Sequence, residues 1–214
     1  MPEFEKIITV ALAGLALSAT PGPSMLYVLS RSVGQSRAAG LASAIGLGLG
    51  GVLLAVASAL GLAALFAAAD WIVPLLRLVG SAYLVWLGID TIRNAEAAAQ
   101  ADMTVRAVET RPFLTIVRQG VMIELLNPKT VLFFALFLPP FVEAGADAGE
   151  ARLQLLVLGI LVPLTAVPSD LIVAWLGGTA AEALNRNRTA RRLLGWLGGA
   201  TLILIAVNLF LNVI

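Results

Sequence analysis

The chain has 214 residues, of which 59% are hydrophobic and only 13% are charged, and its mean hydropathy is +0.94. Soluble domains are about 45–50% apolar and about 25% charged, so this composition predicts a protein that is solvated by lipid. The net charge of +1 argues against a nucleic-acid partner. The sequence has neither cysteine nor histidine, which excludes disulfides, thiolate and imidazole metal sites, and histidine-dependent catalysis.

The first apolar run extends from Ile7 to Ser30 without a charged residue. Its beginning is similar to the apolar region of a signal peptide. Such a peptide carries net positive charge before this region, whereas here Glu3 and Glu5 outnumber Lys6. We therefore expect the run to be kept as the first membrane span.

Charged residues divide the rest of the chain into further runs of this kind. A transmembrane helix needs about 20 apolar residues. The sequence predicts an all-α membrane protein with six spans, at about residues 7–32, 39–69, 72–93, 113–142, 153–181 and 193–213.

The distribution of basic residues predicts the orientation of these spans. Ten of the 14 lysines and arginines flank the connections that follow the first, third and fifth spans. Lys6, Arg77 and Arg152 lie toward the other side, and Lys129 lies inside the fourth span. Because connections rich in lysine and arginine stay in the cytoplasm, both termini are predicted to lie outside it.

The chain divides into two halves of three spans each. Residues 1–94 form the first predicted repeat, residues 95–112 a cytoplasmic linker, and residues 113–214 the second repeat. An odd number of spans per half inverts the second half relative to the first, which is a common plan of secondary transporters. The segments "TPGPSML" and "LNPKTVL" lie at corresponding depths in the first and fourth spans.

Prolines interrupt both of these spans. Pro21 and Pro23 remove two backbone donors, and Gly22 loosens the chain between them. Asn127 and Pro128 repeat this arrangement in the fourth span. We expect helices one and four to be discontinuous near the membrane midplane, because freed carbonyls are tolerated there only where they face protein or a water-filled cavity.

The half-helices that follow the breaks are expected to form a binding site. Their free amides and dipoles favour an anion, and Lys129 adds a positive charge at one of them. Ser24, just after Pro23, is placed to satisfy the other new N-terminus. Glu124 and Asp170 are the candidate carboxylates, since ionisable residues inside a membrane usually face a pathway or pair with one another. A structural ion pair of Lys129 with one of them stays open beside a site that touches substrate or protons.

The same segments resemble a known family of transporters. "TPGPSMLYVLSRSVGQSRAAGLASAIGLGLGG", "GSAYLVWLGIDTIR" and "LLNPKTVLFFALFLPPFV" are similar, in this order, to the opening signature, the third span and the fourth span of the LysE/RhtB family of amino-acid exporters. The resemblance covers nearly the whole chain. It implies a six-span bacterial inner-membrane protein that exports amino acids or close derivatives and is driven by the proton gradient.

The resemblance carries a substrate-binding role over to Pro21, Gly22, Pro23, Asn127, Pro128 and Lys129. Ser24 departs from the asparagine that is common at its position in the family, and Glu124 stands where the family often has a neutral residue. The expected roles of Ser24, Glu124 and Asp170 therefore rest on the chemistry of these residues alone.

These residues suggest a mechanism of proton antiport. The carboxylate of an amino acid docks near Ser24 and Lys129, and its ammonium group faces Asp170 or Glu124. A proton from outside neutralises one of these carboxylates, which releases the substrate outward. The glycine- and alanine-rich surfaces of spans two and five favour a small or medium neutral amino acid.

Other classes of function fit less well. The alternative is a transporter of hard cations or metal ions with a related architecture, for which carboxylates are sparse and soft ligands are absent. An enzyme is not expected, because "WLGID" lacks the Gly-x-Gly-Asp pattern of intramembrane aspartyl proteases. No catalytic residue, metal site or cofactor is predicted. The expected partners are an amino acid, protons and the lipid bilayer, and the sequence leaves open whether the chain forms a homodimer.

Two pairs of glycines are spaced four residues apart. They are Gly46 with Gly50 in the second span, and Gly195 with Gly199 in the sixth. This spacing lets helices approach closely, and we expect both pairs to pack inside the monomer.

Overall fold

The computed structural model describes residues 2–19, 22–66, 72–100, 108–143, 145–186 and 188–211, and all regular structure within them is helical. The elements are α1 (Phe4–Ala19), α2 (Pro23–Gly34), α3 (Arg37–Phe66), α4 (Ile72–Gln100), α5 (Phe113–Leu125), α6 (Pro128–Leu132), the π-helix η1 (Phe133–Phe137), the 3-10 helix η2 (Pro139–Phe141), α7 (Ala148–Arg186) and α8 (Arg188–Phe210). The all-helical prediction is thereby confirmed for this part of the chain.

The first and fourth predicted spans are both broken helices. The axes of α1 and α2 are bent by 56° relative to one another, and those of α5 and the segment Pro128–Phe141 are bent by 50°. In each pair a proline stands at the start of the second helix, where its missing amide hydrogen costs no helical hydrogen bond. The two breaks therefore lie where the prolines predict them.

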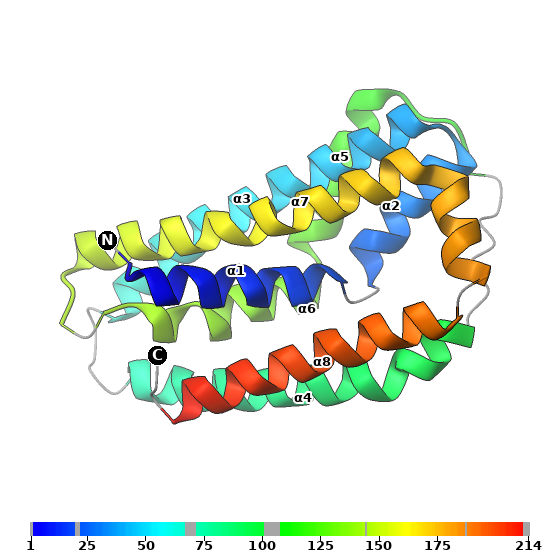
Figure 1. Ribbon diagram of the computed structural model, residues 1–214. Coiled ribbons are helices and arrows are strands. Elements are labelled where there is room, and N and C mark those ends of the chain that lie inside the picture. Colours follow the sequence, from blue (N-terminus) through cyan, green and yellow to red (C-terminus); the bar gives the residue numbers. More distant parts are fainter. Residues whose placement is uncertain are drawn as a thin grey trace.

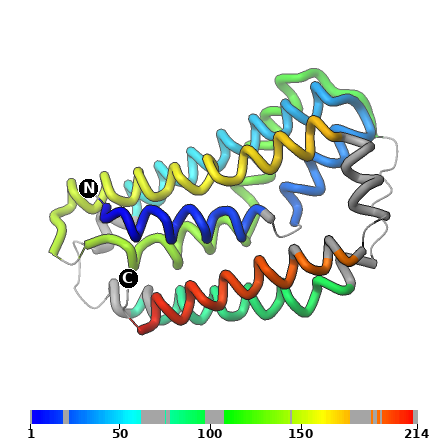
Figure 2. Tube along the Cα trace, viewed as in Figure 1, coloured from blue at the N-terminus to red at the C-terminus, as the bar shows by residue number. Residues whose placement is uncertain are grey.

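The helices are arranged in three layers (Figure 1). In that view α3 and α7 lie side by side above, α1 and α6 lie in the middle, and α4 and α8 form an antiparallel pair below. The tube in Figure 2 shows that α2 runs toward the end of the molecule opposite to the N-terminus, and that α5 begins at that end and runs back toward the middle. The N and C labels in Figure 1 lie at the same end of the molecule, and α2, α4 and α7 all run toward the other end.

Glycines let these helices approach one another closely. A Cβ atom on Gly46 would meet the carbonyl oxygen of Val117 and the Cα of Gly120 on α5, and one on Gly50 would lie 2.7 Å from the Cβ of Glu124. On the other pair of helices, a Cβ on Gly199 would lie 2.6 Å from the carbonyl oxygen of Gly88 on α4. The prediction that both glycine pairs pack within the monomer is confirmed.

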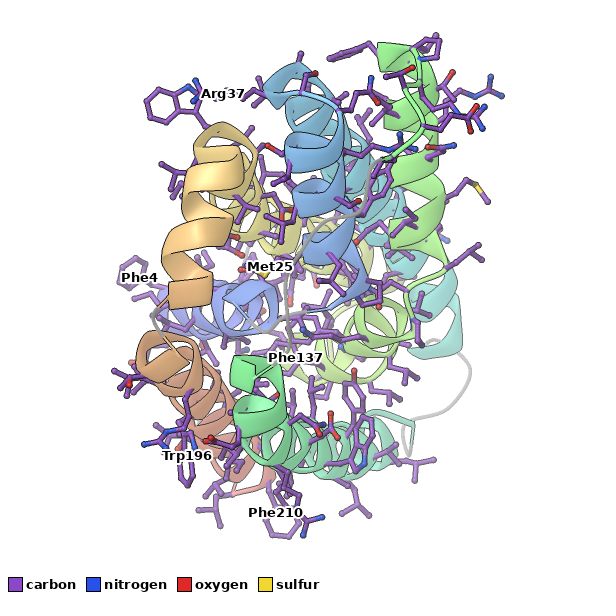
Figure 3. The ribbon with its side chains drawn as sticks, turned by 90° about the vertical axis from the view of Figure 1, so that its right-hand side faces the viewer. Phe4, Met25, Arg37, Phe137, Trp196 and Phe210 are labelled. Carbon is purple, nitrogen blue, oxygen red and sulfur yellow. The ribbon has the colours of Figure 1, made fainter. Side chains whose placement is uncertain are left out.

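Apolar side chains cover the outside of the bundle as well as its core. Figure 3 shows Phe4, Trp196 and Phe210 pointing away from the helices, and they are 74%, 53% and 61% exposed. The core contains the rings of Phe133, Phe137 and Phe141, which are tilted against one another and essentially fully buried. Exposed apolar surface on this scale fits a molecule that is surrounded by lipid.

Part of this surface belongs to helices of membrane-spanning length. The segments Arg37–Gly61 of α3 and Ala148–Leu176 of α7 are long and apolar enough to cross a bilayer, and so is each bent pair if it counts as one span. α8 contributes a shorter apolar segment, Gly195–Phe210. The structure thus supports two to four spans by length and composition, and the count of six stays a prediction.

Two local features differ from the sequence expectations. The third predicted span ends near residue 93, but α4 continues to Gln100 and so takes up the beginning of the predicted linker. The fourth span changes from α-helix to π-helix at Phe133, and the carbonyl of Leu136 in this segment lies against Gly80 of α4. The extension of α4 runs through "NAEAAAQ", whose alanine, glutamate and glutamine residues favour helix, whereas the π-helix has no such local signal.

Candidate functional site

The two helix breaks meet in the interior through hydrogen bonds. The hydroxyl group of Ser24, in the first turn of α2, donates to Oε2 of Glu124 in the last turn of α5 at 2.6 Å. The hydroxyl oxygen of Ser24 in turn accepts from Nδ2 of Asn127 at 3.0 Å. Residues about 100 positions apart are therefore joined where each span is interrupted.

Asn127 holds the start of α6. Its side-chain Oδ1 accepts a hydrogen bond from the backbone amide of Lys129 at 3.1 Å, which makes it the N-cap of this helix. An asparagine in this position satisfies one of the amides that a helix leaves unpaired at its N-terminus. The amide nitrogen of Asn127 is then left facing Ser24.

Lys129 satisfies a carbonyl of the other broken helix. Its Nζ donates to the backbone oxygen of Leu17 in the last turn of α1 at 2.6 Å. In an unbroken helix this oxygen would accept from the amide four residues later, but residue 21 is a proline and has no amide hydrogen. The carbonyl group that the break in the first span leaves without a helical partner is thus hydrogen-bonded to Lys129 of the fourth span.

Tyr83 of α4 supports the same segment from another layer. Its hydroxyl donates to the carbonyl oxygen of Lys129 at 2.9 Å, and its ring is buried. No sequence pattern selects this tyrosine, since tyrosines are common in membrane helices as interfacial anchors and core residues. Its role in holding Lys129 is recognised only from the contact between the two residues in the structure.

A cavity of about 60 Å³ lies at this junction. It is lined from α1, α2, α3, α5, α6, η1 and α7, and Met25, labelled in Figure 3, forms part of its wall. A cavity needs about 10–15 Å³ of such space to hold one water molecule, so this one has room for a small ligand or several waters. Its charged lining groups are Glu124, Lys129 and Asp170.

Serine residues add polar groups to one wall. Ser18 of α1 lines the cavity, and its hydroxyl oxygen lies 3.3 Å from Oγ of Ser169 on α7. The sequence expectation did not include Ser18, although it lies three residues before Pro21. Serines near helix ends often make local hydrogen bonds to the backbone, so the sequence does not distinguish Ser18 as a cavity residue from other serines in such positions.

Spans two and five form the remaining walls, as their glycine- and alanine-rich sequences suggested. Gly48 and Gly51 of α3 face Val167 and Pro163 of α7, where added Cβ atoms would each lie 2.8 Å from those side chains. The absence of a side chain at both glycines keeps this region of the cavity open.

The structure brings together six of the nine residues that the sequence selected for the site. Those that line the cavity are Gly22, Ser24, Glu124, Asn127, Lys129 and Asp170. Pro23 and Pro128 begin α2 and α6, their surfaces are exposed, and they do not line the cavity. Pro21 lies outside the described residues.

One expectation about Ser24 is wrong. The sequence suggested that its hydroxyl would satisfy the N-terminus of α2, but the N-cap is Gly22 and no side chain makes a capping hydrogen bond there. The hydroxyl has one hydrogen, and Glu124 takes it. A carboxylate on another helix has displaced the local backbone interaction.

Comparison with known proteins places the chain in a family. The LysE type translocator family matches residues 15–213. An uncharacterized membrane protein of Synechocystis sp. is 29% identical over 98% of this chain and 97% of its own length. A homoserine/homoserine lactone efflux protein of Salmonella typhimurium is 29% identical over 86% of this chain and 90% of its own.

A third relative is similar over a shorter stretch. A threonine efflux protein of Salmonella typhi is 29% identical over 75% of this chain and 79% of its own length. No solved structure matches the chain at a significant level. The family match extends through both helix breaks and almost to the last residue of the chain. The chain therefore belongs to the LysE type translocator family of membrane transporters.

Proposed function

We propose that this protein exports amino acids or close derivatives from the cytoplasm. The observation that carries the proposal is the cavity between the two helix breaks, which is lined by one ammonium group and two carboxylates. An amino acid has a charge of each sign on one carbon atom, so a small cavity with lining groups of both signs is complementary to it. The relatives named as threonine and homoserine efflux proteins support the same class of substrate.

The substrate carboxylate is proposed to bind at the starts of α2 and α6. Gly22 begins α2 without a side chain that could occupy the first amides, and the dipole of the helix favours an anion there. Lys129 supplies the positive charge beside it. Of the residues that the family resemblance selects, Pro21, Pro23 and Pro128 act in this proposal by breaking the helices.

The substrate ammonium group is proposed to meet a carboxylate, and a proton from outside to release it. Asp170 and Glu124 are the acidic residues of the cavity. Protonation of the carboxylate that holds the ammonium group removes the attraction between them, which couples export to proton entry into the cell.

The size of the substrate follows from the walls of the cavity. A volume of about 60 Å³ with glycines at two places of α3 suits a small or medium neutral amino acid. A longer side chain would have to displace Val167 or Pro163 of α7, which pack against those glycines.

The proposed architecture is a pair of inverted three-helix repeats in the inner membrane of a bacterium. The packing supports it, because α3 packs most extensively with α7 and α4 with α8, and these are the corresponding helices of the two halves. The broken pair α1 and α2 corresponds in the same way to α5 and the helices that follow it. The termini would lie outside the cytoplasm, at the end of the molecule that they share in Figure 1.

Counterflow in proteoliposomes tests this function. Vesicles loaded in turn with each amino acid are assayed for uptake of labelled threonine, homoserine and leucine, with and without a pH gradient. We expect exchange of a neutral amino acid by the wild type and its loss in Lys129→Met, which keeps the side-chain length and removes the charge. Lys6→Met is the matched control, since Lys6 lies at the start of α1 and pairs with Glu3.

Failure to exchange any amino acid would reject the proposal. The test requires that the protein elutes as a folded species from a sizing column. If folded protein exchanges no amino acid, the same vesicles would be assayed for efflux of hard cations, which is the alternative transport activity for this architecture.

A further inference from the structure

Two carboxylates line the cavity, and their surroundings differ. Glu124 accepts the hydrogen bond of Ser24, whereas Asp170 makes neither a hydrogen bond nor an ion pair with any part of the chain that the structure describes. From this difference we infer that Asp170 is the group that binds the substrate ammonium, and that Glu124 is a positioning residue that ties the two helix breaks together. The inference rests on the proposed function of amino-acid export.

Three hydrogen bonds in series connect the backbone amide of Lys129 to Glu124 through Asn127 and Ser24. The donor and acceptor of each bond follow from the amide of Lys129. The amide of Lys129 can only donate, so the side-chain atom of Asn127 that faces it is the oxygen. The nitrogen of Asn127 must then donate to Ser24. Ser24 has a single hydrogen and directs it to Glu124, which therefore acts as an acceptor in this arrangement.

Glu124 is also held by packing. Gly50 of α3 lies beneath its stem, where an added Cβ atom would be 2.7 Å from the Cβ of Glu124 and 3.3 Å from its Cγ. The side chain is thus enclosed between α3 and the first turn of α2. To bind an ammonium group it would have to leave Ser24, and Ser24 would lose the acceptor for its hydrogen.

Asp170 is the better placed of the two for a ligand. It lies on α7, two residues after Pro168, and shares the cavity wall with Ala166 and Val167. Because no described group of the protein occupies its oxygens, an ammonium group can bind there without displacing an existing bond. A carboxylate that is enclosed in this way and left without a donor costs free energy, and the bound cation compensates for that cost.

The hydrogen-bonded link from Glu124 through Ser24 to Asn127 fixes the relative positions of helices. It joins α2 to α5 and to the cap of α6, so it holds both helix starts at the cavity in one arrangement. Disrupting it should alter how fast the protein changes conformation, and leave the recognition of the ammonium group intact.

The test compares an amino acid with the same molecule lacking its ammonium group. Inhibition of counterflow is measured for leucine against 4-methylpentanoate, or for threonine against 3-hydroxybutanoate, according to which amino acid the wild type exchanges. The ratio of the two inhibition constants reports recognition of the ammonium group. For a buried charged contact we expect a ratio of about 100 in the wild type.

We expect Asp170→Asn to lower this ratio to about 1 and Asp170→Glu to retain most of it. Asp170→Ser is the second variant if the asparagine protein does not fold. Glu124→Gln and Ser24→Ala should keep the wild-type ratio while changing the maximal exchange rate by similar factors. The double variant should be no slower than the slower single variant, because both substitutions break the same link.

Ser24→Thr keeps the hydroxyl and is the control that should restore the rate. A wild-type ratio in Asp170→Asn, or loss of the ratio in Glu124→Gln, would overturn the assignment while export itself stands. Absence of exchange of any amino acid by the wild type would instead reject the proposed function, and the assignment with it.

Discussion

Asn127 uses both ends of its side-chain amide where the fourth span breaks. Its oxygen caps α6 at the backbone amide of Lys129, and its nitrogen binds Ser24 of α2. The residue is only 5% exposed, so water cannot replace either partner readily. One side chain therefore supports both the local helix start and the contact between the two breaks.

Asn127→Ala should destabilise the protein because it removes this cap. Loss of an N-cap costs about 0.5–2 kcal/mol, and the buried partners left without a hydrogen bond add to that figure. Asn94→Ala is the matched control, since Asn94 is exposed and binds only Asp90 one turn away in α4. Unfolding of purified protein in detergent measures both, and equal changes in the two variants would contradict the role of the cap.

At the scale of the helices, α3 is the element against which α2, α5 and α7 pack. α5 lies against one of its faces through Gly46 and Gly50, and α7 lies against another through Gly48 and Gly51. The contacts at Gly46 are to backbone atoms of α5, which cannot turn aside as a side chain can. Close approach of helices through small residues is a general means of association in lipid.

Gly46→Ala should therefore push α5 away from α3. The added methyl group would overlap the carbonyl oxygen of Val117, and overpacking of this kind costs about 1–3 kcal/mol. Gly61→Ala in the same helix is the control, because nothing lies within 4 Å of the position of its Cβ atom. The melting temperature in nanodiscs should fall for the first variant and stay within error for the second. A fall of the same size in both would show that the contact with α5 is unimportant.

A second contact between elements joins α2 to the segment that precedes α5. Arg31 is only 8% exposed, and its guanidinium donates to the carbonyl oxygen of Glu109 at 2.8 Å and to Oε1 of Gln119 at 3.0 Å. Gln35, one turn later, accepts from the amide of Arg111 at 3.1 Å. These bonds fasten residues 108–112 to the end of α2.

Arg31→Gln should release this segment. A hydrogen bond to a charged group contributes about 1.5–3 kcal/mol, so exchange of the Arg111 amide with deuterium should accelerate by about tenfold or more. Arg118→Gln on the exposed face of α5 is the control and should leave that rate unchanged. Unaltered exchange in Arg31→Gln would mean that Gln35 alone holds the segment.

At the scale of the whole molecule, the arrangement of the helix ends agrees with the charge distribution. The connection after α2 begins close to Arg31 and Arg37, and the segment before α5 contains Arg111, all at the end opposite to the termini. The positive-inside rule predicts that this end faces the cytoplasm. In the proposed topology the loop before α7 faces the outside.

Labelling of introduced cysteines measures this orientation, and the chain suits the method because it has no cysteine of its own. Thr110→Cys should react with a membrane-impermeant maleimide only when the cytoplasmic side is accessible. Ala148→Cys, at the start of α7, should react in intact cells. Ala174→Cys is the control, since Ala174 is fully buried and should react only after denaturation. The reverse pattern at the first two positions would invert the proposed topology.

Local chemistry made much of this molecule predictable. Pro23 and Pro128 specify helix starts because proline lacks the amide hydrogen that a helix interior needs, and the structure begins α2 and α6 there. Asn127 follows Glu124 by three residues, and both contact Ser24 although Asn127 lies beyond the end of α5. Effects of this kind act within one or two turns, so neighbouring residues are enough to read them.

The sequence by itself therefore determined the lipid-facing composition, the positions of the helix breaks and the three charged residues at the cavity. The tertiary structure alone decided that Ser24 binds Glu124 instead of capping α2, that Tyr83 reaches Lys129, and that Asp170 faces the cavity without a protein partner. Each of these outcomes depends on the distance between residues dozens of positions apart. These distances are determined by the packing of α3 against α5 and α7 and of α4 against η1, and no local pattern in the chain specifies which helices become partners.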